Sequence, residues 1–244
     1  MKRIELIGVE GLPEIRPGDD LGELISTSST LQPGDVLVVA QKIVSKSEGR
    51  LVRLEDVKAG DEAVRIASHL IADPDPRMVQ VVLDESVRVL RSERALITET
   101  RQGYVCANAG VDHSNTQAGV LTLLPEDPDA SARNLRERLR ELTGIAPGVI
   151  VSDTFGRPWR LGIVNVALGV AGLPAMIDLR GTLDDARQPL HATVLAVADD
   201  IAASAGLVMG KTGRTPAVIV RGLDLEGAGT GRDLIRPPAE DLFR

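Results

Sequence analysis

Two neighbouring residues, Asp153 and Thr154, follow an apolar run at residues 148–152 and offer the clearest chemistry in the sequence. We predict that this run is a strand ending at the pair, because ligands of α/β sheets usually bind where strands end. A carboxylate beside a hydroxyl provides hard oxygen ligands for Mg²⁺ or Mn²⁺. Arg157 and Arg160 follow a glycine, and guanidinium groups bind phosphate or carboxylate oxygens. A structural interpretation, with Asp153 as a cap and both arginines in solvent, fits the segment equally well.

A second polar segment, NAGVDHSNT at residues 108–116, crowds small and polar residues into an expected loop. Asp112 can supply the second carboxylate that a divalent cation needs, and Asn115 can bind a base or a phosphate. His113 beside an aspartate does not match a metal-ligand spacing. We therefore expect a neutral or surface role for this histidine.

A third segment brings lysines to the end of an expected buried strand at residues 35–40. Gln41 and Lys42 follow it directly, and Lys46 comes four residues after Lys42. If the chain is helical there, both lysines lie on one face and can bind a polyphosphate. The alternative is an exposed lysine pair without a function.

The segment MGKTGRT at residues 209–215 looks like a phosphate-binding P-loop but lacks its spacing. That motif needs a glycine six residues before the lysine, and Ala205 stands there relative to Lys211. The segment also follows an expected helix. It can still offer backbone N–H groups and a lysine to a phosphate. The glycine-rich GAGTGR at residues 227–232 has no strand-then-helix context, which favours a flexible loop.

Apolar runs alternating with amphipathic segments predict an α/β or mixed α+β fold. The expected strands are residues 3–8, 35–40, 78–83, 95–98, 148–152 and 216–221. The expected helices are residues 61–72, a helix that Asp127 caps from Pro128 to Gly144, and residues 189–205 with Val194, Ala198, Ile201 and Ala205 on one face.

The composition excludes several classes of protein. A formal net charge of -7 and the lack of a long basic run argue against a nucleic-acid partner. The single cysteine, Cys106, cannot form an internal disulfide, and we expect it to be buried. We find neither a signal peptide nor a run of apolar residues long enough to span a membrane, so we expect a cytoplasmic protein.

Several long segments, in order, resemble the coenzyme F420-0:L-glutamate ligases, or gamma-glutamyl ligases. The resemblance runs from GLPEIRPGDDL at residue 11 to DLF at residue 241, through AQKIVSKSEGRLV, LITETRQG, GVDHSN, LPEDPDASA, VSDTFGRPWRLG and TPAVIVRG. Such enzymes activate a carboxylate of the deazaflavin with GTP, and the amine of L-glutamate attacks the acyl phosphate. A second glutamate follows through a gamma link.

The resemblance also implies site residues, cofactors and partners. Asp112 and Asp153 would be catalytic, and with Thr154 they would bind Mg²⁺ or Mn²⁺ at two sites, alongside a monovalent cation such as K⁺. GTP would contact Leu12, Pro13, Glu14, Ile15, Gln41, Lys46 and Asn115, and a stretch near residues 207–214 that includes Met209, Gly210 and Lys211. Arg157 and Arg160 are candidates for substrate binding on their own chemistry.

The implied fold is specific to the family and forms an intertwined homodimer. We expect one ligase domain over residues 1–244, without the flavin-binding domain that follows in some members, and partners that are GTP, L-glutamate and coenzyme F420-0. Two alternatives stay open: a metal-dependent phosphohydrolase, which would need no glutamate, and a homologue that binds nucleotide without catalysis.

Overall fold

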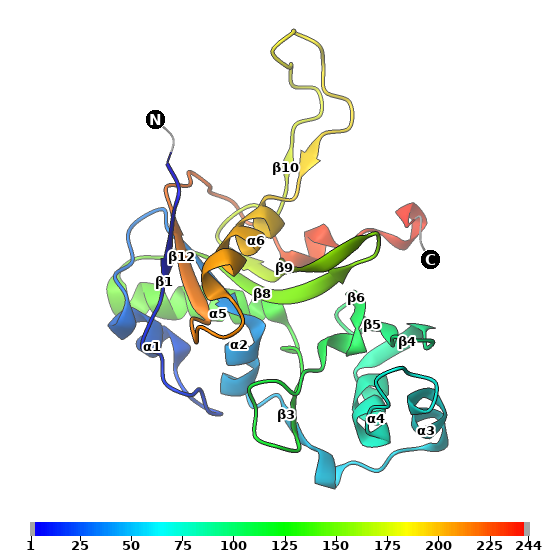
Figure 1. Ribbon diagram of the computed structural model, residues 1–244. Coiled ribbons are helices and arrows are strands. Elements are labelled where there is room, and N and C mark those ends of the chain that lie inside the picture. Colours follow the sequence, from blue (N-terminus) through cyan, green and yellow to red (C-terminus); the bar gives the residue numbers. More distant parts are fainter. Residues whose placement is uncertain (1–2, 242–244) are drawn as a thin grey trace.

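The computed structural model describes residues 3–241, so the last two residues of the DLF motif lie outside it. A five-stranded sheet organises the larger part of the molecule (Figure 1). Its strands, in spatial order, are β1 (Glu5–Gly8), β12 (Ala217–Arg221), β2 (Val36–Ala40), β8 (Gly148–Arg157) and β9 (Arg160–Ala171). Strands β2 and β8 are parallel, and the other neighbours are antiparallel. The fold is therefore mixed α/β, as predicted.

Helices cover both faces of this sheet, which explains why its central strands are apolar throughout. Leu37 and Val39 of β2 face one apolar cluster, together with α1 (Leu21–Ser28) and α5 (Pro128–Thr143). Val36 and Val38 face the other cluster, which α6 (Val197–Met209) covers. This alternation is the two-residue period of a strand.

The bounds of α5 confirm the prediction from its capping residues. The Asp127 side chain accepts a hydrogen bond from the Ala130 N–H at 2.9 Å, and Pro128 takes the first helical position. Gly144 ends the helix in the left-handed conformation with φ 76°, which glycine adopts without a steric penalty.

Residues 51–123 form a smaller part with its own apolar cluster (Figure 1). It contains α3 (Asp61–Ala67), α4 (Pro76–Asp84), a three-stranded sheet of β4 (Ser86–Arg91), β5 (Ile97–Thr100) and β6 (Val105–Ala107), and the pair β3 (Leu51–Arg53) and β7 (Val120–Thr122). Short 3-10 turns follow β3 and β6 at η1 (Leu54–Asp56) and η2 (Asn108–Gly110). The predicted strand at 95–98 corresponds to β5, displaced by about two residues.

The strand predicted at residues 78–83 is wrong, because this segment lies within α4. The Asp75 side chain accepts a hydrogen bond from the Arg77 N–H, and Pro76 stands in the first turn. This start signal outweighs the β preference of the valines. Val79 and Val82 then face the core at helical spacing.

The helix predicted at residues 189–205 begins only at Val197, and the one predicted at 61–72 ends at Ala67. Val194 belongs to the short strand β11 (Val194–Leu195), which pairs with β10 (Ile177–Asp178). These strands form the base of an arm, residues 176–196, that projects from the body (Figure 1). The rest of the predicted face, including Ala198, Ile201 and Ala205, is buried in α6 as expected.

The glycine-rich tail packs against the body, contrary to the prediction of a flexible loop. A Cβ on Gly229 would lie 2.1 Å from the Ala175 nitrogen, and one on Gly231 would lie 1.8 Å from the Leu168 oxygen. The Gly231 N–H also donates to the buried carboxylate of Asp129. The segment then continues into the short turns η3 (Gly231–Leu234) and η4 (Pro238–Glu240).

Cys106 is buried, as predicted, and burial raises its thiol pKa to about 12. The thiol therefore stays protonated and unreactive at neutral pH. Within residues 3–241, no helix is both long and apolar enough to cross a membrane.

Candidate active site

Asp153 and Thr154 lie in the middle of β8, which continues to Arg157, so the prediction that the strand ends at this pair is wrong. The strand continues because β9 pairs with it, placing Val166 opposite Asp153 and Asn165 opposite Thr154. On its other side, however, β8 outruns its parallel neighbour. Strand β2 ends at Ala40, opposite Ser152. The pair therefore stands just beyond the carboxyl end of β2, the position where ligands of such sheets bind.

Helix α2 (Gln41–Ser47) begins directly after β2 and carries both lysines toward the loop that follows η2. The Lys42 ammonium lies 2.7 Å from the Asp112 carboxylate and donates to the Ser114 carbonyl oxygen. Lys46, one turn later, donates to the Asn115 carbonyl oxygen at 2.8 Å. The predicted sharing of one helical face is confirmed. The two lysines attach this loop to the main sheet.

Segment 209–215 reaches the same place from the end of α6. The Lys211 ammonium donates to the Thr154 hydroxyl, which in turn donates to the Asn165 amide oxygen at 3.0 Å. Gly210 ends α6 with a positive φ of 55°. As predicted, the segment follows a helix and is not a P-loop. Asn165 was missed by the sequence analysis, because only the register of β8 and β9 identifies the partner of Thr154.

The two carboxylates differ in their electrostatics. Burial raises the pKa of Asp153 to about 6, although the Thr154 N–H and the Lys211 charge oppose the shift. The nearby Asp112 charge raises it further. Burial also raises the pKa of Asp112, but hydrogen bonds from Lys42 and Ser114 outweigh it and leave that pKa below its ordinary value. Paired carboxylates with opposite shifts are typical of functional sites.

The loop at residues 12–15 lies beside α2, and its Glu14 forms an ion pair with Lys46 at 2.5 Å. Pro13 is exposed, whereas Leu12 packs against the core and Ile15 is buried. Gln41 is also buried, and its amide oxygen accepts a hydrogen bond from Ser45. Met209 is buried as well, within the cluster beneath α6. The exposed groups of these predicted nucleotide contacts are therefore Pro13, Glu14, Asn115, Gly210 and Lys211.

Arg157 and Arg160 are not brought to this group of residues. They face each other at the end of the β8–β9 hairpin, and both are exposed. At about 3.3 Å per residue, Arg157 lies roughly 13 Å along the strand from Asp153. Its guanidinium donates to the Leu161 carbonyl oxygen in the same turn. The turn expected after Thr154 is absent, because β8 continues to Arg157, and the substrate role of the two arginines stays a prediction.

The donor set suits a hard divalent cation. Two carboxylates and one hydroxyl supply oxygen ligands, and Mg²⁺ commonly takes one or two carboxylates together with substrate phosphates. The Asp112 charge contributes to the raised pKa of Asp153, so the two carboxylates interact electrostatically. No group of three or more His, Cys, Asp or Glu residues gathers for a metal within residues 3–241. Phosphate oxygens and water would therefore complete the coordination.

A model of the F420-0:gamma-glutamyl ligase family matches residues 11–222. The chain belongs to this family. The match contains every element of the ligase's candidate active site, from the loop at 12–15 to the segment at 209–215. The resemblance inferred from the sequence motifs is thus confirmed, and the protein is an enzyme of the ligase class.

Relatives of this ligase match over nearly their full length. A protein from Methanopyrus kandleri named coenzyme F420:L-glutamate ligase is 47% identical over an alignment of 249 residues that covers 99% of this chain and 97% of the relative. Proteins of the same name from Archaeoglobus fulgidus and Methanothermobacter thermautotrophicus are 47% and 45% identical, with 99% of this chain covered and 97% and 99% of theirs.

Proposed function

We propose that this ligase adds L-glutamate to coenzyme F420-0 with GTP as the energy source. The names of the relatives support glutamate as the donor and the coenzyme as the acceptor. A carboxylate is a poor electrophile, so the γ-phosphoryl group of GTP first passes to the acceptor carboxylate, giving an acyl phosphate and GDP. The glutamate amine then attacks the acyl carbon, releases phosphate and forms the amide. A second GTP then phosphorylates the γ-carboxylate of this first glutamate, and the amine of a second glutamate displaces the phosphate to form the gamma link.

The observation that carries this proposal is the meeting of Lys42, Lys46 and Lys211 with two carboxylates beyond the end of β2. The ammonium groups offset the negative charge of the nucleotide phosphates and of the acceptor carboxylate, so that phosphate and carboxylate can approach each other. Positioning the glutamate amine within reach of the acyl phosphate contributes a further part of the rate.

Asp112, Asp153 and Thr154 are the residues that would hold Mg²⁺ or Mn²⁺ in one or two sites, with a monovalent cation such as K⁺ beside them. When bound, the divalent metal would neutralise charge on the transferring phosphoryl group. Lys42 and Lys211 donate to two of these three side chains, so their positive charges also lie beside the proposed metal site.

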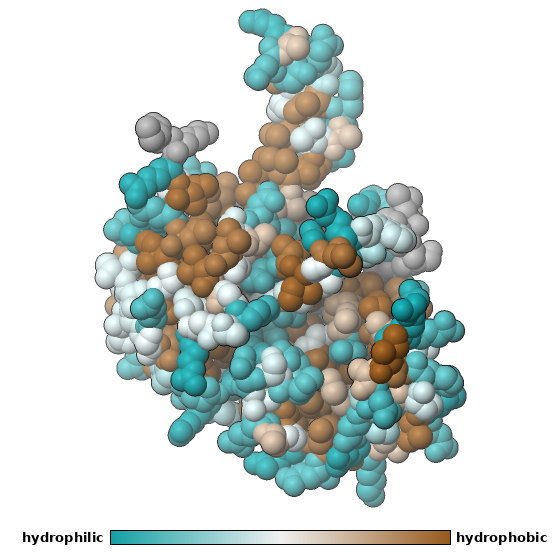
Figure 2. Space-filling model, viewed as in Figure 1, coloured by the Kyte–Doolittle hydropathy of each residue, from teal (hydrophilic) through white to brown (hydrophobic). Residues whose placement is uncertain are grey.

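We also propose that the ligase is a homodimer, with the arm as part of its interface. The arm has only two short strands, and an isolated hairpin is marginally stable in water. Met176, Leu183, Val194 and Leu195 are nevertheless exposed along it. Figure 2 shows apolar side chains gathered where the arm leaves the body. A second copy of the chain would cover this surface.

The test is to incubate the protein with GTP, Mn²⁺, L-glutamate and coenzyme F420-0 and to follow the acceptor by mass spectrometry. The expected product gains the mass of one or two glutamate residues, and GDP appears only when both the acceptor and glutamate are present. Phosphate release without glutamate would favour a phosphohydrolase. GTP binding without any product would favour a homologue that has lost catalysis.

A further inference from the structure

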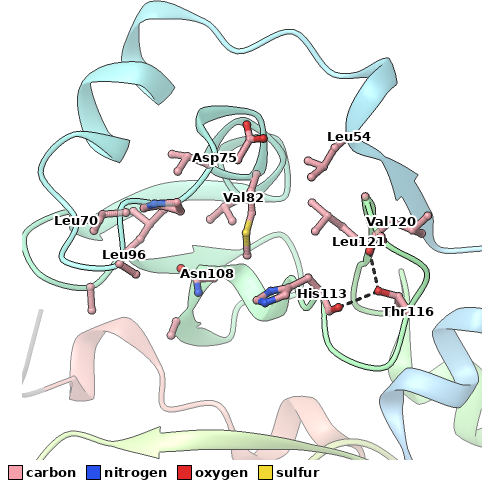
Figure 3. A pocket seen from close by; sticks show the side chains of 18 of the residues that line it. Leu54, Leu70, Asp75, Val82, Leu96, Asn108, His113, Thr116, Val120 and Leu121 are labelled. Carbon is pink, nitrogen blue, oxygen red and sulfur yellow. Dashed lines mark hydrogen bonds between the residues drawn. The ribbon is translucent and has the colours of Figure 1, made fainter.

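An apolar cavity of about 680 Å³ lies in the smaller part of the molecule, next to the candidate active site. Its walls come from α4, β7 and the residues before β5 and after β6 (Figure 3). The apolar lining includes Leu54, Leu70, Met78, Val82, Leu96 and Leu121. A cavity of this size and character is typical of sites for small organic ligands.

The loop that carries Asp112 also forms one wall of this cavity. Asp112 and the Asn115 carbonyl meet the lysines of α2, whereas His113 and Thr116 line the cavity. The Thr116 hydroxyl donates a hydrogen bond and lies within bonding distance of both the His113 and the Val120 carbonyl oxygens (Figure 3). The loop is thereby held in a narrow turn, with the charged site on one side and the apolar space on the other.

Most of the lining is apolar, and its polar or charged members are Asp75, Arg94, Asn108, His113, Thr116 and Gln117. Figure 3 shows the Asn108 amide and the His113 ring on the same side of the cavity, below Val82. Within residues 3–241, neither side chain takes part in a side-chain hydrogen bond that would tie it to the protein. Both can therefore bond to the edge of a planar ligand. By contrast, the Asp75 carboxylate at the rim is already bound by Arg77.

We propose that the cavity binds the deazaflavin ring of the acceptor, with Asn108 and His113 bonding to its polar edge. This inference rests on the proposed function, in which the acceptor is a flat ring on a charged arm. The ring needs an apolar environment and the arm needs a charged one. The loop at residues 112–121 contacts both kinds of environment within a few residues. The arm passes along this loop, so that its carboxylate reaches Asp112, Asp153 and the lysines.

The alternative occupant, the base of GTP, fits the cavity less well. The three lysines that suit a triphosphate donate to Asp112, Asn115 and Thr154, and none of these acceptors lines the cavity. A guanine base also needs several donors and acceptors around its edge, whereas most of the lining is aliphatic. A ring with a large apolar area is the better match.

Small residues at the cavity allow a test that leaves the core intact. Ala107 in β6 and Ala118 in the loop line the cavity and are exposed, so a phenylalanine at either place fills the space without replacing a packed side chain. Ala228 is also exposed but lies in the tail, far along the chain from the cavity lining. Ala228→Phe is the matched control.

The probe is the deazaflavin chromophore with its ribityl chain but without the phosphate-containing arm, titrated by fluorescence into the full-length protein. Ala107→Phe and Ala118→Phe are expected to weaken its binding about tenfold or more, and Ala228→Phe is expected to leave it unchanged. In turnover assays, the first two variants should raise the KM for coenzyme F420-0 and leave the KM for GTP as it is.

Wild-type affinity for the chromophore in both cavity variants would overturn the inference, and so would a rise in the KM for GTP alone. The proposed function fails in a different way. If the wild-type protein transfers no glutamate but the cavity variants still lose the chromophore, the ring site stands and the reaction is wrong. If glutamate is transferred and the chromophore binds equally to all variants, the reaction stands and the ring site is wrong.

Discussion

The two carboxylates of the candidate active site stand on very different supports. Asp153 lies within β8, which pairs with β2 as far as Ser152 and with β9 at Asp153 itself, so the backbone of the sheet fixes its place. Asp112 begins a loop: its backbone forms an isolated β-bridge with Thr122, and its side-chain oxygens accept hydrogen bonds from Lys42 and from the N–H and hydroxyl groups of Ser114. A continuous strand therefore positions one carboxylate, whereas the other follows a single bridge and is held also by contacts that a ligand can replace.

This difference has a chemical side as well. Lys42, which bonds to the Asp112 carboxylate, is a cation and helps to keep the pKa of Asp112 low, whereas burial keeps the pKa of Asp153 high. A carboxylate that is buried without a direct lysine partner gains most when a cation binds. We therefore expect Asp153 to contribute most to metal binding and Asp112 to contribute most to holding its loop in place.

The largest expected effect comes from Asp153→Asn. Loss of this carboxylate should lower the rate of glutamate transfer by about 10³-fold or more, since the amide cannot replace a charged metal ligand. The melting temperature without metal should not fall. The control is Asp224→Asn, at an exposed position in the segment after β12. Near-normal turnover in Asp153→Asn would show that the Asp153 carboxylate is not essential.

Lys42→Met tests the loop side. Removing the ammonium should raise the pKa of Asp112, loosen the loop and lower kcat/KM for GTP by about 10²-fold. Lys58→Met, at an exposed lysine outside the site, should behave like the wild type. Steady-state kinetics at varied GTP measures both variants. Equal values for Lys42→Met and Lys58→Met would mean that the loop is positioned without this contact.

The pH dependence of stability separates the two carboxylates without any substrate. Asp153 has a folded pKa of about 6 against an ordinary value of 3.8, so the folded state binds the proton more tightly. In chelator, the wild type should therefore lose stability as the pH rises from about 4 to 6, by no more than about 3 kcal/mol. Asp153→Asn should lack this loss, as measured by urea unfolding at each pH. Parallel curves for both proteins would contradict the assignment.

The smallest effects should come from the neutral neighbours, and they sharpen the contrast. Ser114→Ala removes the hydroxyl that donates to Asp112 and accepts from Lys42, and should raise the KM for GTP by about threefold to tenfold. The bond from the Ser114 N–H to Asp112 remains, which limits the effect. Asn165→Ala should change the KM less, because the register of β8 and β9 already holds Thr154. A larger change in the KM for GTP with Asn165→Ala than with Ser114→Ala would mean that the strand positions its residue less firmly than the loop does.

The elements that could be predicted are those that local rules determine. Buried valine runs identified β2 and β12, and the Asp127–Pro128 start and Gly144 stop identified α5. The helix at residues 78–83 was misread because its valines favour a strand and its capping aspartate was overlooked. The arm was misread because apolar residues on a hairpin and on a helix can share a spacing over a short span.

Most residues of the site could be predicted from the sequence, but their arrangement in space could not. Each polar segment was recognisable by itself, and the contact of Lys42 with Ser114, two residues after Asp112, spans 72 positions of chain. No local pattern encodes such a contact, and none reveals that β8 runs on past Thr154 toward Arg157. The pairing of β8 with β9 places Arg157 away from Asp153 and places Asn165 beside Thr154.

The tail at residues 227–232 bears on how glycine patterns are interpreted in general. Gly229 and Gly231 have no room for even a methyl group, because backbone atoms of Leu168 and Ala175 stand where it would go. An alternating glycine spacing can therefore serve to let two main chains touch. A motif search that scores spacing alone would count this tail among the phosphate loops, and the direction of the neighbouring backbone would be the feature that separates the two.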